Sequence, residues 1–143
     1  MHSNPRAAPA ANPHILVIPK WWPNARDPQL GDFIRKQVQA LAQFTKVTVL
    51  LVESDAERSP YTEHIEADGL HVVRSRYKAC RSRLAPWRKA VNLMRYRHAA
   101  MAGWRMVIAH RDLPALGHVH ILVRPALIAW WLKWRHGIPY VLR

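Results

Sequence analysis

The chain has 143 residues, of which 50% are hydrophobic, and its 22 Lys and Arg against 9 Asp and Glu give a formal net charge of +13. This length and apolar fraction suit one globular domain with a buried core. The single cysteine, Cys80, excludes an internal disulfide and fits a reducing compartment. The most apolar run, residues 125–134, has only ten residues, too few to span a membrane. We therefore expect a cytoplasmic protein.

The first thirteen residues are rich in Ala, Pro and Asn and contain no apolar stretch of signal-peptide length. Such a composition cannot bury enough apolar surface to fold, and it lacks the core of a targeting sequence. We expect a disordered tail at 1–13 and a folded domain at 14–143.

A strand, a proline-rich loop and a helix are predicted next. Ile15–Ile18 is a continuous apolar run of strand length, and the loop at 19–28 contains three prolines that end it. From Leu30 onward the apolar spacing becomes that of a helix. We expect its packed face to hold four apolar side chains, those of Phe33, Ile34, Val38 and Leu41.

Two residues of this unit each allow two interpretations. Gln37 falls between Phe33 and Leu41 on the face expected to pack, so its amide needs a partner in the loop backbone or in a ligand pocket under the loop. Gly31 either eases the turn into the helix or leaves room for a ligand at the first helical amides, where the dipole favours anions.

The middle of the chain predicts two strands and a long helix. Residues 46–52 are apolar and β-branched, as in a strand covered on both faces of a parallel sheet. The segment 53–68 holds six of the nine acids and is expected to be a surface loop. A third strand is predicted at 70–74, and a helix at 84–108 despite Gly103.

The last part of the chain repeats the alternation of strand and helix. A fourth strand is predicted at 118–123, and Pro125 suits the first position of a helix that runs to His136, with Gly137 as its stop. A fifth strand follows at 138–142. This alternation predicts an α/β fold, a Rossmann-like, mostly parallel sheet with flanking helices.

Positive charge is concentrated between Arg74 and Arg111, where eleven Lys or Arg residues occur without an acid. Such a block suits nucleic acid, an anionic membrane surface or an anionic saccharide, although a solvated face explains it as well. A helical projection places Arg88 beside Arg95, so these two and Lys89 form a candidate anion patch. The block has no pattern of stacking aromatic residues, which disfavours nucleic acid.

Two positions near the fourth strand could bind a ligand. His120 at a strand end could hydrogen-bond a sugar hydroxyl, or it could be a satisfied structural residue. Arg124 precedes a helix amino terminus and opposes its dipole, a conflict that a bound anion or solvent would resolve. A zinc site at His110, His118 and His120 lacks a carboxylate or thiolate at a helpful spacing, so no metal is expected.

Three segments resemble the amino-terminal half of glycosyltransferase family 4 enzymes, which have the GT-B fold. The first, residues 15–37, contains Pro-Lys-Trp-Trp-Pro, Asp-Pro-Gln-Leu-Gly and Phe-Ile-Arg-Lys-Gln. The second is His-Val-His at 118–120, followed by Arg-Pro-Ala at 124–126. The third is His-Gly-Ile-Pro-Tyr-Val-Leu at 136–142, which is similar to the family's "GIPYV" strand.

The resemblance implies retaining transfer of a sugar from a nucleotide sugar to a glycan or lipid-linked acceptor, without metal or cofactor. In that family, a glycine-bearing loop after the first strand lies against the donor phosphates or the acceptor, which corresponds to Gly31 and Lys20 here. The second His of the HxH motif lies at the reaction centre, which corresponds to His120. With Gln37 and Arg124, these residues form the candidate site, at the inner face of a membrane where cell-envelope polysaccharide is made.

The chain also departs from the family. Pro114–Gly117 stands where an acidic residue usually precedes HxH, and the chain stops at Arg143, at the fifth strand. The loop that normally follows, and the carboxyl-terminal domain with its EX7E carboxylates and donor contacts, are missing. We therefore expect a truncated half of a GT-B enzyme, inactive alone. The alternative is a non-catalytic basic module that binds an anionic membrane or nucleic acid.

Overall fold

The computed structural model describes residues 12–55, 60–67, 69–120 and 124–143, and the tail predicted at 1–13 lies outside them except for its last two residues. Among the helices of this part of the chain, none is both long and apolar enough to cross a membrane. The elements, in chain order, are β1 (His14–Ile18), α1 (Asp32–Ala42), β2 (Lys46–Asp55), β3 (Tyr61–Ala67), β4 (Leu70–Lys78), α2 (Ala85–His110), β5 (Leu116–Val119), α3 (Arg124–His136) and β6 (Tyr140–Leu142).

The strands of the described residues form one sheet in the order β3-β4-β2-β1-β5-β6. All neighbouring pairs are parallel except β3 with β4. The predicted Rossmann-like α/β class is therefore confirmed. The chain first places β2 on one side of β1 and later places β5 on the other side, so the strand order reverses between β1 and β5. Such a reversal is a topological switch point.

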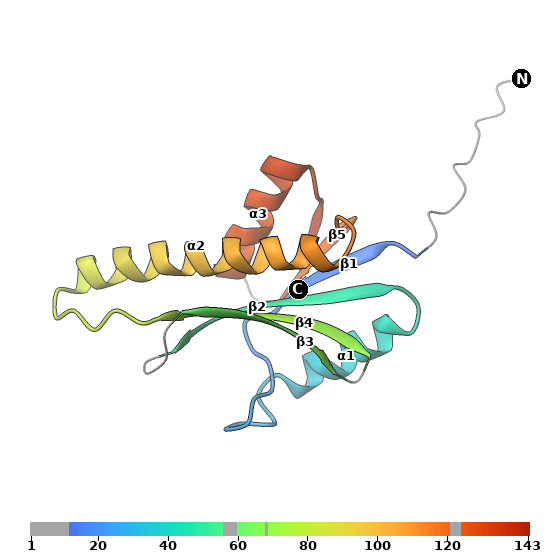
Figure 1. Cartoon of the computed structure of the whole chain (residues 1–143), viewed down its shortest axis with the longest axis horizontal. Coiled ribbons are helices and arrows are strands. Elements are labelled where there is room, and N and C mark those ends of the chain that lie inside the picture. The colour runs from blue at the N-terminus through green and yellow to red at the C-terminus, as the bar shows by residue number, and fades with distance from the viewer. Residues whose placement is uncertain (1–11, 56–59, 68, 121–123) are drawn as a thin grey trace, which may run out of the picture.

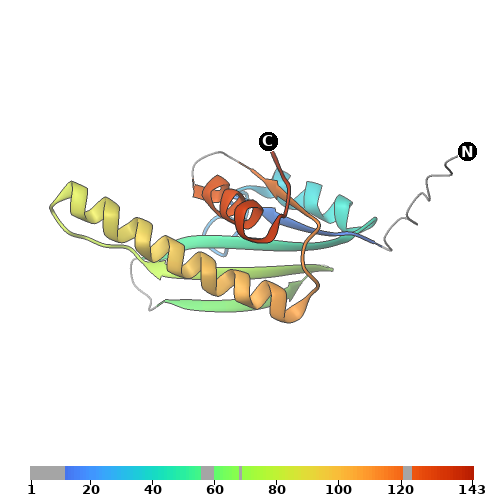
Figure 2. The ribbon, with the colours of Figure 1, turned by 90° about the horizontal axis from the view of Figure 1, so that it is seen from above.

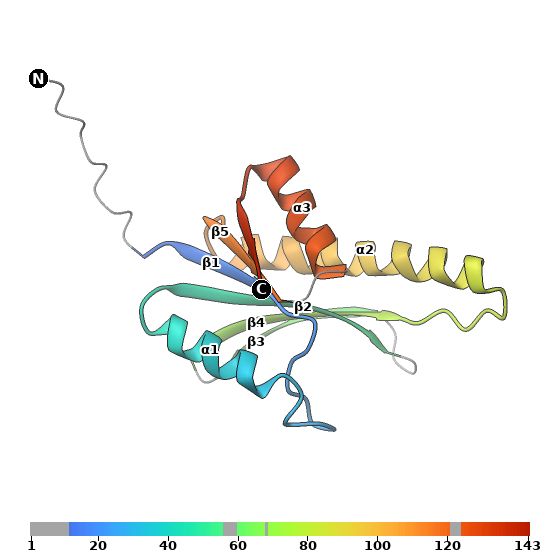
Figure 3. The same cartoon turned by 180° about the vertical axis from the view of Figure 1, so that it is seen from behind.

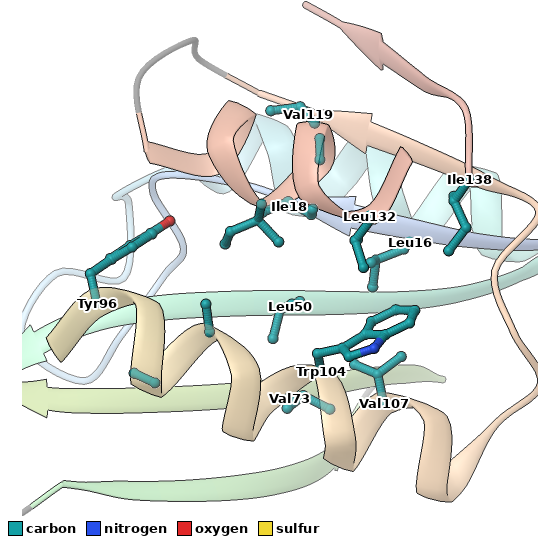
Figure 4. Close-up of a cluster of buried hydrophobic side chains, with 14 of the residues drawn as sticks. Leu16, Ile18, Leu50, Val73, Tyr96, Trp104, Val107, Val119, Leu132 and Ile138 are labelled. Atoms are coloured by element: carbon teal, nitrogen blue, oxygen red, sulfur yellow. The ribbon is translucent and has the colours of Figure 1, made fainter. Parts of the chain in front are cut away.

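Helices cover both faces of the sheet (Figures 1 and 3), with α2 and α3 on one face and α1 on the other. Seen from above, the amino-terminal half of α2 extends beyond α3 (Figure 2). The α2–α3 side encloses the larger apolar cluster, in which Leu16, Leu50 and Trp104 are buried (Figure 4). Burying side chains of this size stabilises the fold by about 1.5–3 kcal/mol each.

The prediction of a surface loop at 53–68 is wrong. Strand β2 continues to Asp55, and β3 pairs antiparallel with β4 at the edge of the sheet. An edge strand keeps one side in solvent and so tolerates charge, and here the charges are also paired. Arg76 of β4 lies 3.2 Å from Glu53 and 3.7 Å from Asp55, while Glu63 sits opposite Arg74 in the register.

The packed face of α1 is narrower than predicted. Ile34 and Val38 are buried and Leu41 is partly buried, whereas Phe33 is 59% exposed and Gln37 is exposed. Successive residues are rotated by about 100°, so a stripe centred between Ile34 and Val38 leaves Phe33 about a third of a turn away. The expectation that both residues face the core is therefore corrected.

Three histidines join β3, β4 and the end of α2. A nitrogen of His64, Nε2, lies 3.0 Å from Nδ1 of His71, and the rings of His64 and His110 stack with centroids 4.2 Å apart. Burial lowers the pKa of His64 and His71, and the charges of His110 and Arg111 lower both further against the opposing effect of Glu66. The folded cluster thus favours neutral rings.

This cluster predicts acid-sensitive stability. Since the folded pKa of His64 and His71 lies below the ordinary 6.5, the unfolded chain binds protons first, and the stability present above about pH 6.5 falls as the pH falls. Urea unfolding of the wild type and of H64Q/H71Q at about pH 7.5 and about pH 5.5 should show a smaller acid loss in the variant. The other histidines contribute equally to the acid loss of stability in both proteins. Equal losses in the wild type and the variant would therefore contradict an origin in His64 and His71.

Candidate functional site

His120 lies where the strand order reverses, immediately after β5. Its backbone N–H donates to the carbonyl of Ile18 at 3.2 Å, so the residue sits beside the carboxyl end of β1. The side chain is 4% exposed, and within the described residues its Nε2 has no hydrogen-bond partner. A buried polar atom without a partner is uncommon in a folded protein, which makes this nitrogen a candidate ligand contact.

A second imidazole stands next to it on the same face. Val119 points into the α2–α3 cluster, and because side chains alternate along a strand, His118 and His120 both point to the α1 side. Their ring centroids are 4.4 Å apart. Burial lowers the pKa of both rings, and the charge of Arg143 lowers both further. Near pH 7 the pair is neutral, and each ring offers one donor and one acceptor.

Arg143 and Gln37 complete this edge. The backbone N–H of Arg143 donates to Val119 at 2.9 Å, which continues the β5–β6 pairing. Its guanidinium donates to the Gln37 side-chain oxygen at 3.4 Å. The exposed Gln37 therefore lies at this edge through Arg143, and not through either predicted partner, the loop backbone or a ligand under the loop. Sequence reasoning missed Arg143, whose only signal was its place directly after the fifth strand.

Gly31 owes its lack of a side chain to the chain's own loop. Its φ is +69°, and a Cβ there would lie 2.7 Å from the Trp21 carbonyl oxygen. This close packing favours the turn interpretation. The first turn of α1 also already contains a carboxylate, that of Asp32. This carboxylate pairs with Arg35 at 2.7 Å and with Lys36 at 2.8 Å. A ligand contact at Gly31 stays a prediction, as does one at the exposed Lys20, whose Nζ lies 5.4 Å from the Trp21 ring centroid.

Arg124 is engaged on the α2 side of the sheet. Its guanidinium donates to the Tyr77 hydroxyl at 2.6 Å and lies 5.4 Å from the Tyr96 ring centroid. Burial raises the pKa of Tyr96 although Arg124 opposes the shift. Arg124 is therefore held by two tyrosines on the α2 side, while His118 and His120 face the α1 side. Arg124 as a ligand contact stays a prediction.

The three residues of the predicted anion patch lie in the first half of α2. Arg88 donates to the Ser82 carbonyl at 3.2 Å and Arg95 to the Lys78 carbonyl at 2.8 Å, while Lys89 is exposed. Each of the two arginines has further donors for an anion. The three histidines considered for zinc are separated, because His110 stacks on His64 rather than on the other two. In the described ranges, no three His, Cys, Asp or Glu form a metal-binding group.

Comparison with known proteins supports the fold alone. No family model matches the chain, and no curated protein matches it in sequence. The C-terminal domain of a hydrogenase from Pyrococcus furiosus has a similar solved structure, with a TM-score of 0.59, 12% sequence identity and 95% of each chain covered. At this identity the likeness describes the arrangement of helices and strands and carries no argument about chemistry.

The Gly31 contact predicts a specific loss of stability. Both Gly31 and Gly137 have positive φ, yet a Cβ at Gly137 meets nothing within 4 Å. G137A should therefore cost about 1–2 kcal/mol in unfolding free energy for its left-handed backbone. G31A should cost about 1–3 kcal/mol more, for the collision with the Trp21 backbone. Denaturant unfolding of the two variants measures the difference, and equal losses would show that the loop does not press on Gly31.

Proposed function

We propose that the edge around His120 binds a sugar, and that the chain is the acceptor-side half of a retaining glycosyltransferase with the GT-B fold. The proposed reaction moves a sugar from a nucleotide sugar to a glycan or lipid-linked acceptor of cell-envelope polysaccharide. The observation that carries the proposal is the buried Nε2 of His120 at the switch point of the sheet, which has no hydrogen-bond partner among the residues that the structure describes. In open α/β sheets, ligands bind outside the carboxyl ends of the strands at such a switch point.

The chemistry of the edge suits a sugar that bears a negative group. Neutral His118 and His120 rings can donate to or accept from hydroxyl groups, and their lowered pKa keeps them neutral near pH 7. Arg143 adds a cation that can pair with a phosphate, and Gln37, already bonded to it, can hold its orientation. In this proposal His120 touches the reacting sugar, while Lys20, Gly31 and Arg124 are outer contacts.

The proposal also limits what the chain does alone. A GT-B enzyme reacts in the cleft between two domains, so one half should bind a substrate weakly and should not turn over. No release of nucleotide above the blank is expected from any nucleotide sugar. Release or transfer by the purified chain would contradict the assignment as a half-enzyme.

The alternative is a non-catalytic module on the inner face of an anionic membrane. It is favoured by one observation: α2 carries five Lys or Arg residues and α3 carries three, and neither helix has an acid. Such a surface gains about 1 kcal/mol per basic residue near anionic lipid. This alternative requires no ligand at His120, so the two functions can be tested separately.

The sugar proposal is tested by NMR of the imidazole rings during titration with nucleotide sugars and sugar phosphates. The His118 and His120 rings should shift on binding, with a Kd of about 1 mM. H120A should weaken binding about tenfold, the cost of one lost hydrogen bond. H110A is the matched control, because His110 is exposed on the other side of the sheet, and it should leave the affinity unchanged. If no sugar ligand shifts the two rings, or if H120A binds as tightly as the wild type, the proposal fails.

A further inference from the structure

An apolar groove of about 460 Å³ runs between α2 and α3 on the outer surface of the protein. Met94 of α2 is 71% exposed and Trp130 of α3 is 59% exposed, and Leu93 and Leu127 line the groove beside them. The floor is the buried core, including Trp104. Apolar surface gathered in one place, in contrast to scattered single residues, marks an interaction site.

The two helices that form the groove are also the basic side of the molecule. Their eight Lys and Arg residues have no acid on either helix, whereas Asp32 lies on α1 and Glu53 and Glu63 lie on β2 and β3. Arg97 lines the groove itself, and its long side chain can cover apolar surface while its guanidinium stays at a polar boundary. The groove is therefore apolar inside, and Arg97 places a cation at its rim.

We propose that this groove receives the acyl chains of an anionic bilayer while the basic residues of α2 and α3 contact lipid phosphates. Trp130 is exposed and lies one helical turn before Lys133 on α3, and Trp near a cation is suited to the membrane interface. Exposed Met94 and Leu93 can enter the acyl boundary as interfacial apolar residues do. A second copy of the chain would bring two cationic faces together, which is unfavourable. The inference rests on the membrane-binding alternative above and does not depend on sugar transfer.

Vesicle flotation tests the groove. Wild-type protein should float with vesicles of phosphatidylcholine and phosphatidylglycerol, and not with phosphatidylcholine alone. Because Met94 and Trp130 would be buried in the bilayer, M94A/W130A should weaken binding more than tenfold. The matched control is F33A/F44A, since Phe33 and Phe44 are 59% and 80% exposed at α1 and just after it. The control should bind like the wild type, and circular dichroism should show that both variants are folded.

The outcomes separate the proposals. Loss of binding in M94A/W130A alone supports the groove as the lipid contact. Unchanged binding in that variant overturns the groove but keeps a purely electrostatic membrane module, while no binding to either vesicle overturns both. A wild-type dimer that M94A/W130A dissociates in sedimentation would assign the groove to a second copy. Oligonucleotide binding that the same variant weakens would assign it to nucleic acid, and either result overturns the lipid proposal.

Discussion

The pairing of β1 with two neighbours is the constraint on which the structure depends. β1 has five residues, and Leu16, Val17 and Ile18 are at most 1% exposed. Because side chains alternate, Leu16 and Ile18 enter the α2–α3 cluster and Val17 the α1 cluster, so one short strand joins both helical layers. His14 fixes its beginning, with Nε2 2.7 Å from the Thr48 hydroxyl. The same pairing brings His120 to the carboxyl end of β1, where its backbone N–H donates to the carbonyl of Ile18.

Charge is sorted between the two sides of this sheet. Acidic side chains of β2 and β3 lie close to the arginines of β4 near the edge of the sheet, where Arg76 lies 3.2 Å from Glu53. Much of the negative charge is therefore paired with arginines inside the sheet. The cations of α2 and α3 have no acid on their own helices. The two helices together contribute +8 of the net charge of +13, so an anionic partner would gain most on this side of the sheet.

Local patterns predicted the parts of the fold that local physics decides. The run Ile15–Ile18 and the α3 stop at Gly137, with φ +68°, depend on neighbouring residues only. Strand β3 was missed because its polar sequence is stabilised by pairing with β4, which no periodicity records. Phe33 was wrongly predicted to be buried, because the part of α1 that is buried depends on how much of the helix surface contacts the sheet. Arg143 joined the site through strand register, which likewise appears only after folding.

If the His120 edge binds a ligand as proposed, its electrostatics would couple that binding to protonation of the two histidines. Arg143 lowers the pKa of His118 and His120, and burial lowers both more strongly. An anion that pairs with Arg143 would cancel the cationic contribution and raise both pKa values toward 6.5. By linkage, the affinity of such an anion then rises as the pH falls, because the bound state takes up protons more readily. A neutral sugar leaves the cation in place and has no such dependence. In the proposed site, charge alone would thus distinguish a phosphorylated ligand from a plain saccharide.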